Sequence, residues 1–195
     1  MRRVRTFGIL IYMEDKRIIV HLIRGEAKES HENITRSLVD KLDAFPVHDR
    51  VVPHLTIKRW FDLNQVDVQA VYAAIDTIVS NHKQSSYRLH GLNNFGEGVI
   101  FVDVDASKAM LETVGAVMTA MRVIEGMTFD EYDEIEGDLH ATVAMRALKP
   151  FDFKETWDYL QTLPPIDMNL QFDNIALLKK FDNKWMPEKV WELSE

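Results

Sequence analysis

Residues 52–57 read Val-Pro-His-Leu-Thr-Ile, and residues 138–143 read Asp-Leu-His-Ala-Thr-Val. Each stretch contains His-x-Thr followed by an apolar residue, and each lies near the middle of one half of the chain. Their short runs of apolar and β-branched residues are typical of strands. Two similar motifs in similar surroundings indicate a divergent internal repeat.

Strand geometry assigns the residues of the first motif to two faces, because successive side chains of a strand point to opposite sides of the sheet. Leu55 and Ile57 fall on one face, and His54, Thr56 and Lys58 fall on the other. The apolar face is expected to pack under helices. His54 and Thr56 are therefore predicted to be presented together on the opposite face.

The second motif repeats this arrangement. Ala141, Val143 and Met145 are expected on the apolar face. The other face is expected to carry His140, Thr142, Ala144 and Arg146. If the two strands lie side by side, two imidazoles, two hydroxyls and at least one cation meet at one place.

Such a group of side chains suits an attack on phosphorus. Imidazole titrates near pH ~6.5, so one histidine can be neutral and the other protonated at the same pH. The neutral one would take a proton from water, and the protonated one would donate to the leaving oxygen. Thr56 and Thr142 could donate hydrogen bonds to phosphate oxygens, and Lys58 or Arg146 could neutralise their charge. No metal or other cofactor is required.

With these two motifs the sequence resembles the 2H phosphoesterase superfamily, which includes 2′-5′ RNA ligase and cyclic phosphodiesterase proteins. The motifs match at residues 54–57 and 140–143, and Pro53, the hairpin over residues 95–104 and the stretch 172–177 are also similar. The resemblance implies an α+β fold with a bilobal, pseudo-two-fold arrangement. Each lobe would be a mainly antiparallel sheet with helices on its outer face, and a central cleft would lie between the lobes.

The same resemblance implies a function. It implies metal-independent hydrolysis of 2′,3′-cyclic phosphates of nucleotides or RNA ends, commonly to a 2′-phosphate. His54 and His140 would be the acid–base pair, and Thr56 and Thr142 would bind phosphate. The sequence does not say which histidine is the base. Three alternatives stay open: a nucleotide or RNA-end binding module without turnover, reversible 2′-5′ RNA ligation, and a cyclic phosphate that is not a nucleotide.

An acidic segment precedes the second motif and departs from the family pattern. One interpretation is a solvated loop, and the other is a lid that repels long RNA or selects a different substrate. Its acidic residues are Glu125, Asp130, Glu131, Asp133, Glu134, Glu136 and Asp138.

The remaining candidates carry weaker signals. Phe95 and Tyr12 could stack on a base, with core packing as the alternative. Arg59 is expected to face away from the motif side unless a bulge reverses its direction. Asp103 and Asp105 have no histidine at ligand spacing, so we assign them no metal. Five further histidines lie in no motif and receive no role: His21, His31, His48, His82 and His90.

Composition limits the class of protein. The chain has 195 residues, 23 Lys plus Arg, 31 Asp plus Glu and a net charge of −8, with no cysteine. This acidity disfavours a general nucleic-acid coat, because such proteins bind by neutralising phosphates. The absence of cysteine excludes disulfides and suits the cytoplasm. No apolar run approaches the ~18 residues that a membrane span needs. We expect residues 1–195 to form one domain of two pseudo-symmetric lobes, and a monomer.

The periodicity predicts alternating strands and helices, mainly with antiparallel pairing. Expected strands cover residues 7–13, 17–23, 51–60, 87–93, 99–105, 139–145, 166–180 and a closing segment ending near 193. Expected helices cover residues 30–44, 68–79, 107–121 with Ser107 as the N-cap, and 153–160.

Overall fold

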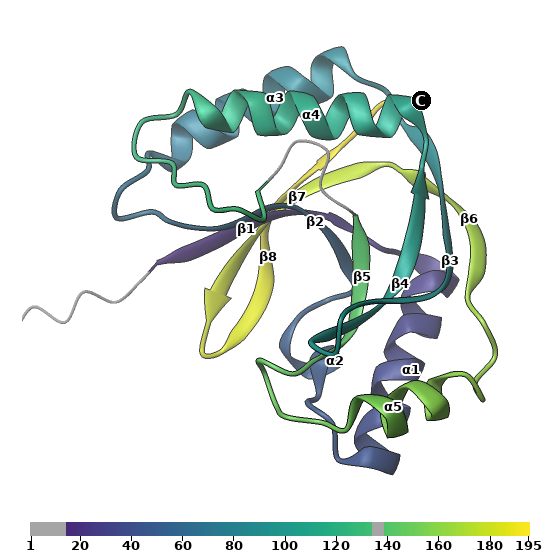
Figure 1. Cartoon of the computed structure of the whole chain (residues 1–195). Coiled ribbons are helices and arrows are strands. Elements are labelled where there is room, and N and C mark those ends of the chain that lie inside the picture. Colours follow the sequence, from purple (N-terminus) through teal and green to yellow (C-terminus); the bar gives the residue numbers. More distant parts are fainter. Residues whose placement is uncertain (1–14, 134–138) are drawn as a thin grey trace, which may run out of the picture.

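The computed structural model describes residues 15–133 and 139–195 (Figure 1). The elements are β1 (Lys16–Leu22), α1 (Gly25–Leu42), α2 (Val47–Arg50), β2 (His54–Asp62), α3 (Val68–Asn81), β3 (Ser85–Phe95), β4 (Val99–Ala106), α4 (Lys108–Arg122), β5 (His140–Met145), α5 (Phe153–Leu160), β6 (Asp167–Phe172), β7 (Asn174–Phe181) and β8 (Lys184–Glu192). The expected strand over 7–13 and Tyr12 lie outside the described residues.

The strands form two four-stranded sheets. The first has the order β2-β1-β7-β8 and the second the order β5-β4-β3-β6, and every neighbouring pair is antiparallel. The predicted α+β fold with two lobes is therefore confirmed. Each motif strand, β2 or β5, is an edge strand of its own sheet.

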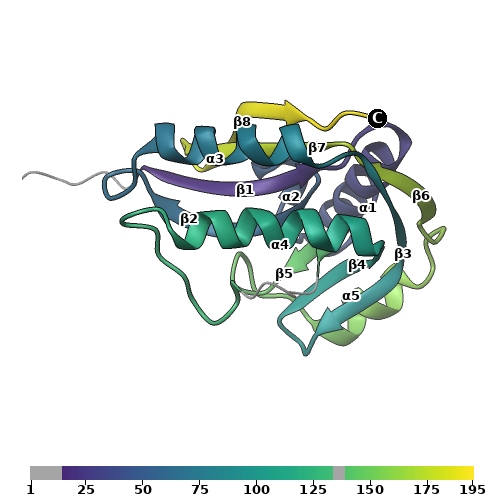
Figure 2. The same ribbon diagram turned by 90° about the horizontal axis from the view of Figure 1, so that it is seen from above.

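The helices cover the two sheets in pairs (Figures 1 and 2). Helices α3 and α4 pack on one another; α3 contacts β8 of the first sheet, and α4 contacts β2 of the first sheet and β3 of the second. Helix α1 contacts β5 and α5 beside the second sheet. Ser107 caps α4 as predicted, accepting a hydrogen bond from the Met110 amide. No helix in the described ranges is long and apolar enough to cross a membrane.

The register of both motif strands is interrupted at the same motif position. In β2, Thr56 is opposite Val20 and Lys58 is opposite Ile19, so Ile57 is an extra residue. In β5, Thr142 is opposite Phe101 and Ala144 is opposite Ile100, so Val143 is an extra residue. Both strands therefore bulge at the apolar residue that follows the motif threonine. Their first five residues accordingly show the same alternation of half-buried and buried positions.

One predicted strand is wrong. Residues 166–180 were expected to form a single strand, but the chain breaks at Asp173, and β6 and β7 belong to different sheets. The side chain of Asn174 accepts from the Leu22 amide at 2.9 Å and donates to the Leu22 carbonyl at 3.1 Å. This pairing attaches the start of β7 to β1. The short helix α2 was not predicted.

Candidate active site

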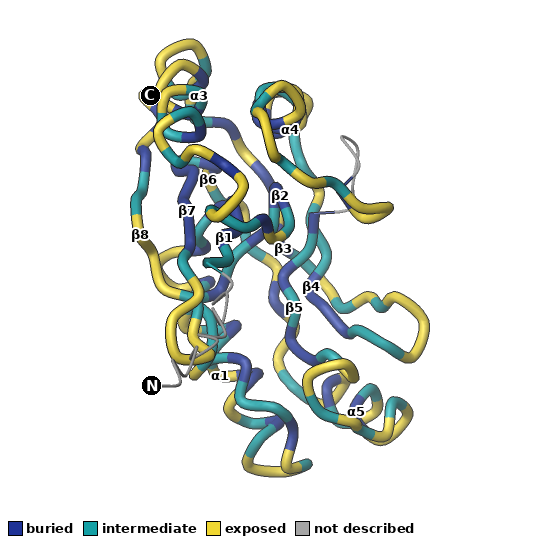
Figure 3. The backbone as a smooth tube through the Cα atoms, turned by 90° about the vertical axis from the view of Figure 1, so that its left-hand side faces the viewer, coloured by how far each residue is buried: buried dark blue, intermediate teal, exposed yellow. Residues whose placement is uncertain are grey.

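The two motifs meet where β2 and β5 lie side by side, at adjoining edges of the two sheets (Figure 3). His54 and Thr56 are half-buried, and so are His140 and Thr142, whereas the apolar residues between them are buried. The predicted division into a buried and a presented face is confirmed for the first four residues of each strand; beyond the bulges it is wrong, because Lys58 and Ala144 are buried and Met145 is half-buried. We call His54, Thr56, His140 and Thr142 the motif cluster.

His54 is held in a defined orientation. Its Nδ1 lies 2.8 Å from the carbonyl oxygen of Val52, and a carbonyl can only accept, so Nδ1 carries the proton. In the neutral ring, Nε2 is then a bare acceptor. Burial, with a smaller contribution from the charge of His140, lowers the pKa of His54 to about 4. His54 is therefore neutral near pH 7.

His140 lies against two aromatic rings. The Phe95 ring is 4.9 Å from the imidazole in an edge-on arrangement, and the Phe101 ring is 4.9 Å away at a tilt. Phe95 and Phe101 also contact one another, with centroids 4.4 Å apart. Phe95 nevertheless keeps 43% of its surface exposed. A flat apolar surface is therefore available beside one of the two histidines.

Lys58 requires a correction. Strict alternation predicted that it shares the face of Thr56, but the bulge at Ile57 places it opposite Ile19, and it is fully buried. Its ammonium donates to a carboxylate oxygen of Asp133 at 2.8 Å and lies 4.6 Å from the Phe129 ring. Burial lowers the pKa of Lys58 despite this partner. The structure thus gives Lys58 an internal ion pair.

Groups of β2 form ion pairs and a hydrogen bond with the first part of the acidic segment. The carboxylate of Asp133 also accepts from the backbone amide of Arg59 at 3.0 Å. The Arg59 guanidinium pairs with Asp130 at 2.7 Å and lies 4.7 Å from the Tyr132 ring. The first part of this segment is thereby attached to the edge of the strand that carries His54. Residues 134–138 lie outside the described ranges.

Arg146 follows β5 at the far end from His140. It is exposed, with its guanidinium 3.3 Å from a Glu97 carboxylate oxygen and 3.3 Å from the Phe151 carbonyl. Its proposed contact with phosphate stays a prediction.

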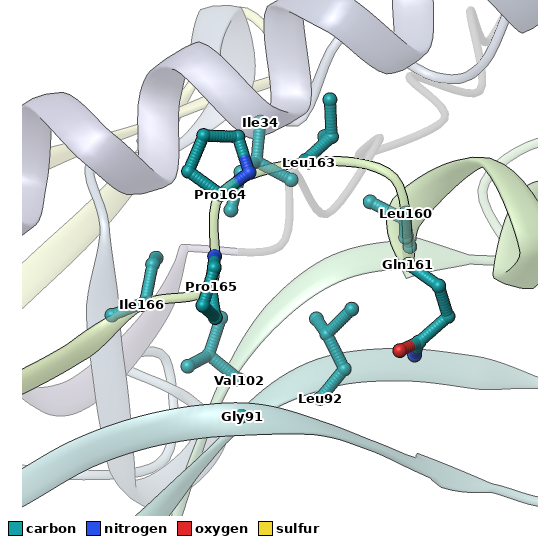
Figure 4. Close-up of a pocket in the computed structure, with 10 residues that line it drawn as sticks. All are labelled: Ile34, Gly91, Leu92, Val102, Leu160, Gln161, Leu163, Pro164, Pro165 and Ile166. Atoms are coloured by element: carbon teal, nitrogen blue, oxygen red, sulfur yellow. The ribbon is translucent and has the colours of Figure 1, made fainter.

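Two cavities are lined by residues outside the motif cluster. One, of about 250 Å³, is enclosed mainly by apolar residues of α1, the second sheet and the turn after α5, among them Ile34, Leu92 and Pro165 (Figure 4). The other, of about 230 Å³, lies between β1, β3 and β6 and includes His21 and Tyr87. Within residues 15–133 and 139–195, no group of three histidine or acidic side chains is arranged to hold a metal ion.

The family model of the 2′-5′ RNA ligase superfamily matches residues 24–183, a range that contains both motifs. The chain belongs to the 2′-5′ RNA ligase superfamily. The resemblance to the 2H phosphoesterases, based on the paired motifs, is thereby confirmed.

Several solved structures share the fold of this member of the 2′-5′ RNA ligase superfamily. TT0787 of Thermus thermophilus superposes with a TM-score of 0.63 at 13% identity, covering 91% of this chain and 97% of that one. E. coli LigT complexed with 3′-AMP superposes with a TM-score of 0.60 at 12% identity, covering 94% of this chain and 100% of that one. A third structure, described as a phosphoesterase, superposes with a TM-score of 0.56 at 13% identity, covering 94% of this chain and 100% of that one. No curated protein sequence matches the chain.

Sequence reasoning assigned no role to His31, a histidine that bonds the backbone of the second motif in this superfamily member. His31 of α1 is buried, and its Nε2 lies 2.9 Å from the carbonyl oxygen of Thr142. The available signal was its position on the buried stripe of the helix, with Ala27, Ile34 and Leu38. A histidine on such a stripe needs a polar partner, because a buried polar group is costly without one.

Proposed function

We propose that this member of the 2′-5′ RNA ligase superfamily hydrolyses 2′,3′-cyclic phosphates of nucleotides or RNA ends, without a metal, using His54 and His140. The observation that carries the proposal is the contact between β2 and β5, strands of separate sheets that each present a half-buried histidine and a half-buried threonine in the same order. A matched pair of acid and base is what a displacement at phosphorus needs.

The orientation of His54 suggests the division of roles. Because Nδ1 donates to Val52, the lone pair of Nε2 is available to accept a proton from the attacking water. The water oxygen forms a bond to phosphorus as the bond from phosphorus to the 3′ oxygen breaks. His140, in its protonated form, donates a proton to that leaving oxygen. The product keeps a 2′-phosphate, and proton exchange with solvent restores both histidines.

The threonines and Phe95 complete the proposed site. The hydroxyls of Thr56 and Thr142 donate to the non-bridging oxygens of the bound phosphate, which are negatively charged in the substrate and throughout the reaction. Phe95, exposed beside His140, offers a surface on which a base can stack. Lys58 has no place in this site, because its ammonium is buried against Asp133.

Structures of the same fold support a ligand of nucleotide size. E. coli LigT has been solved complexed with 3′-AMP, with ATP and with NADP+. LigT in these complexes is 12% to 14% identical to the present chain, so the similarity of fold supports the choice of nucleotides as ligands to test.

The test is a phosphodiesterase assay on the four 2′,3′-cyclic nucleotides and on oligonucleotides with a cyclic-phosphate end. Phosphorus NMR would show which hydroxyl keeps the phosphate. His54→Ala and His140→Ala are each expected to lower kcat/KM by ~10²–10⁴-fold. His82→Ala is the control, since His82 bonds Thr113 away from the motif cluster.

Three outcomes would change the assignment. Full activity in both motif variants would exclude the acid–base pair. Binding of cyclic nucleotides by the wild type without any product would instead indicate a binding module. Activity is expected to persist in EDTA, and its complete loss there would indicate a metal enzyme.

A further inference from the structure

His31 joins α1 to the second motif by one hydrogen bond. Its side chain is 3% exposed, and Nε2 lies 2.9 Å from the Thr142 carbonyl oxygen. Because the carbonyl can only accept, Nε2 is the protonated nitrogen. Nδ1 is then a buried acceptor that has no protein partner among the described residues.

The hydrogen bond from His31 to Thr142 lies where the regular pairing of β5 with β4 is interrupted. β5 has a strand neighbour only on the β4 side, and its ladder is interrupted by the bulge at Val143, directly after Thr142. A bulge leaves backbone groups without ladder partners and lets the local direction of the strand vary. His31 supplies the partner for the peptide group that links Thr142 to the bulge.

The strand of the first motif is held in a comparable way. At the open edge of β2, just after its own bulge, Asp133 accepts a hydrogen bond from the Arg59 amide. Each motif strand is thus fastened beside its bulge by a side chain from a distant segment. The partner for β2 is a carboxylate, and the partner for β5 is an imidazole.

His31 is neutral at working pH. Burial, with a smaller contribution from His54, lowers its pKa to about 4, and the hydrogen bond to Thr142 places His31 beside the motif cluster. A cation here would compete with the proposed acid–base pair, whereas a neutral imidazole acts only through its hydrogen bond.

We infer that His31 is a positioning residue: by holding the Thr142 carbonyl at the β5 bulge, it directs the Thr142 hydroxyl toward the phosphate of the substrate. The inference rests on the proposed function. It predicts that loss of the His31 bond weakens phosphate binding, because a misdirected hydroxyl loses a hydrogen bond to a charged group. Such a loss affects ground state and transition state alike, so KM should rise while kcat changes little.

Two variants of similar polarity test this inference. His31→Gln places an amide nitrogen where the imidazole Nε2 lies, whereas the side chain of His31→Asn is one methylene shorter and does not reach Thr142. We expect about a 10-fold rise in KM for a 2′,3′-cyclic nucleotide with His31→Asn. With His31→Gln we expect KM to change by less than about 3-fold. His82→Asn is the control, because His82 bonds Thr113 of α4 and neither residue belongs to the motif cluster.

A second measurement keeps the inference independent of turnover. The dissociation constant of inorganic phosphate, determined by calorimetry on the same folded variants, should follow the same order. Equal KM and equal phosphate affinity in the Gln and Asn variants, with an active wild type, would overturn the role of His31 alone. A wild type that neither turns over cyclic nucleotides nor binds phosphate would refute the proposed function, and the role of His31 with it.

Discussion

The buried pair of Lys58 and Asp133 is expected to dominate the stability of the region around the first motif. Both side chains are nearly inaccessible, at 0% and 3% exposure, and their charged atoms are 2.8 Å apart. Asp133→Asn would leave the Lys58 ammonium buried without its paired carboxylate, although the Arg59 carbonyl still accepts from it and the Phe129 ring still lies beside it. Breaking one side of a buried pair costs about 3–5 kcal/mol, so we expect a loss of that order in the free energy of unfolding.

The expected loss is large enough to measure in two ways. Urea unfolding followed by circular dichroism gives the free energy directly. For a chain of this size, a change of 1 kcal/mol moves Tm by about 2–4 °C, so Asp133→Asn should lower Tm by roughly 6–20 °C. The double variant Lys58→Met with Asp133→Asn should cost less than the sum of the single variants, because it removes the uncompensated charge.

A matched control lies three residues away. Asp130 pairs with Arg59 at 2.7 Å, but it is 44% exposed. Asp130→Asn should therefore cost only about 0–1 kcal/mol, as exposed ion pairs do. If Asp133→Asn costs no more than Asp130→Asn, or if the double variant is simply additive, the argument from burial is refuted.

Three further predictions concern pH and ligand binding. The pKa of His21 and that of His31 are each lowered to about 4 by burial, below the usual 6.5 of an unfolded chain, so unfolding takes up protons. The free energy of unfolding should be highest above pH ~6.5 and should fall toward pH ~4, by up to about 3 kcal/mol for each histidine. A urea midpoint that does not change over this pH range would contradict the burial of both rings. The acid limb of kcat/KM should lie near pH 4, where His54 becomes protonated, and a midpoint near 6.5 in folded enzyme would exclude His54 as the buried base. Phe95→Ala should weaken binding of a nucleotide by about 5–100-fold but leave inorganic phosphate affinity unchanged, and equal losses for both ligands in calorimetry would rule out stacking.

Local patterns were sufficient to predict the motifs and their faces. Alternation along a strand depends only on backbone geometry, so it correctly separated His54 and Thr56 from Leu55, and likewise His140 and Thr142 from Ala141. The Ser107 cap was also predictable, because a cap is formed by residues three apart. The paired motifs were enough to recognise the superfamily.

Long-range pairing determined what these patterns could not. The bulge at Ile57 turns Lys58 inward, and it exists only because β2 pairs with β1 in that register. The bond from His31 to Thr142 joins residues 111 positions apart. The break at Asp173 sends two consecutive strands into different sheets. Hydropathy along the chain records which side chains avoid water, but register and partners depend on backbone groups that meet only after the two sheets have formed.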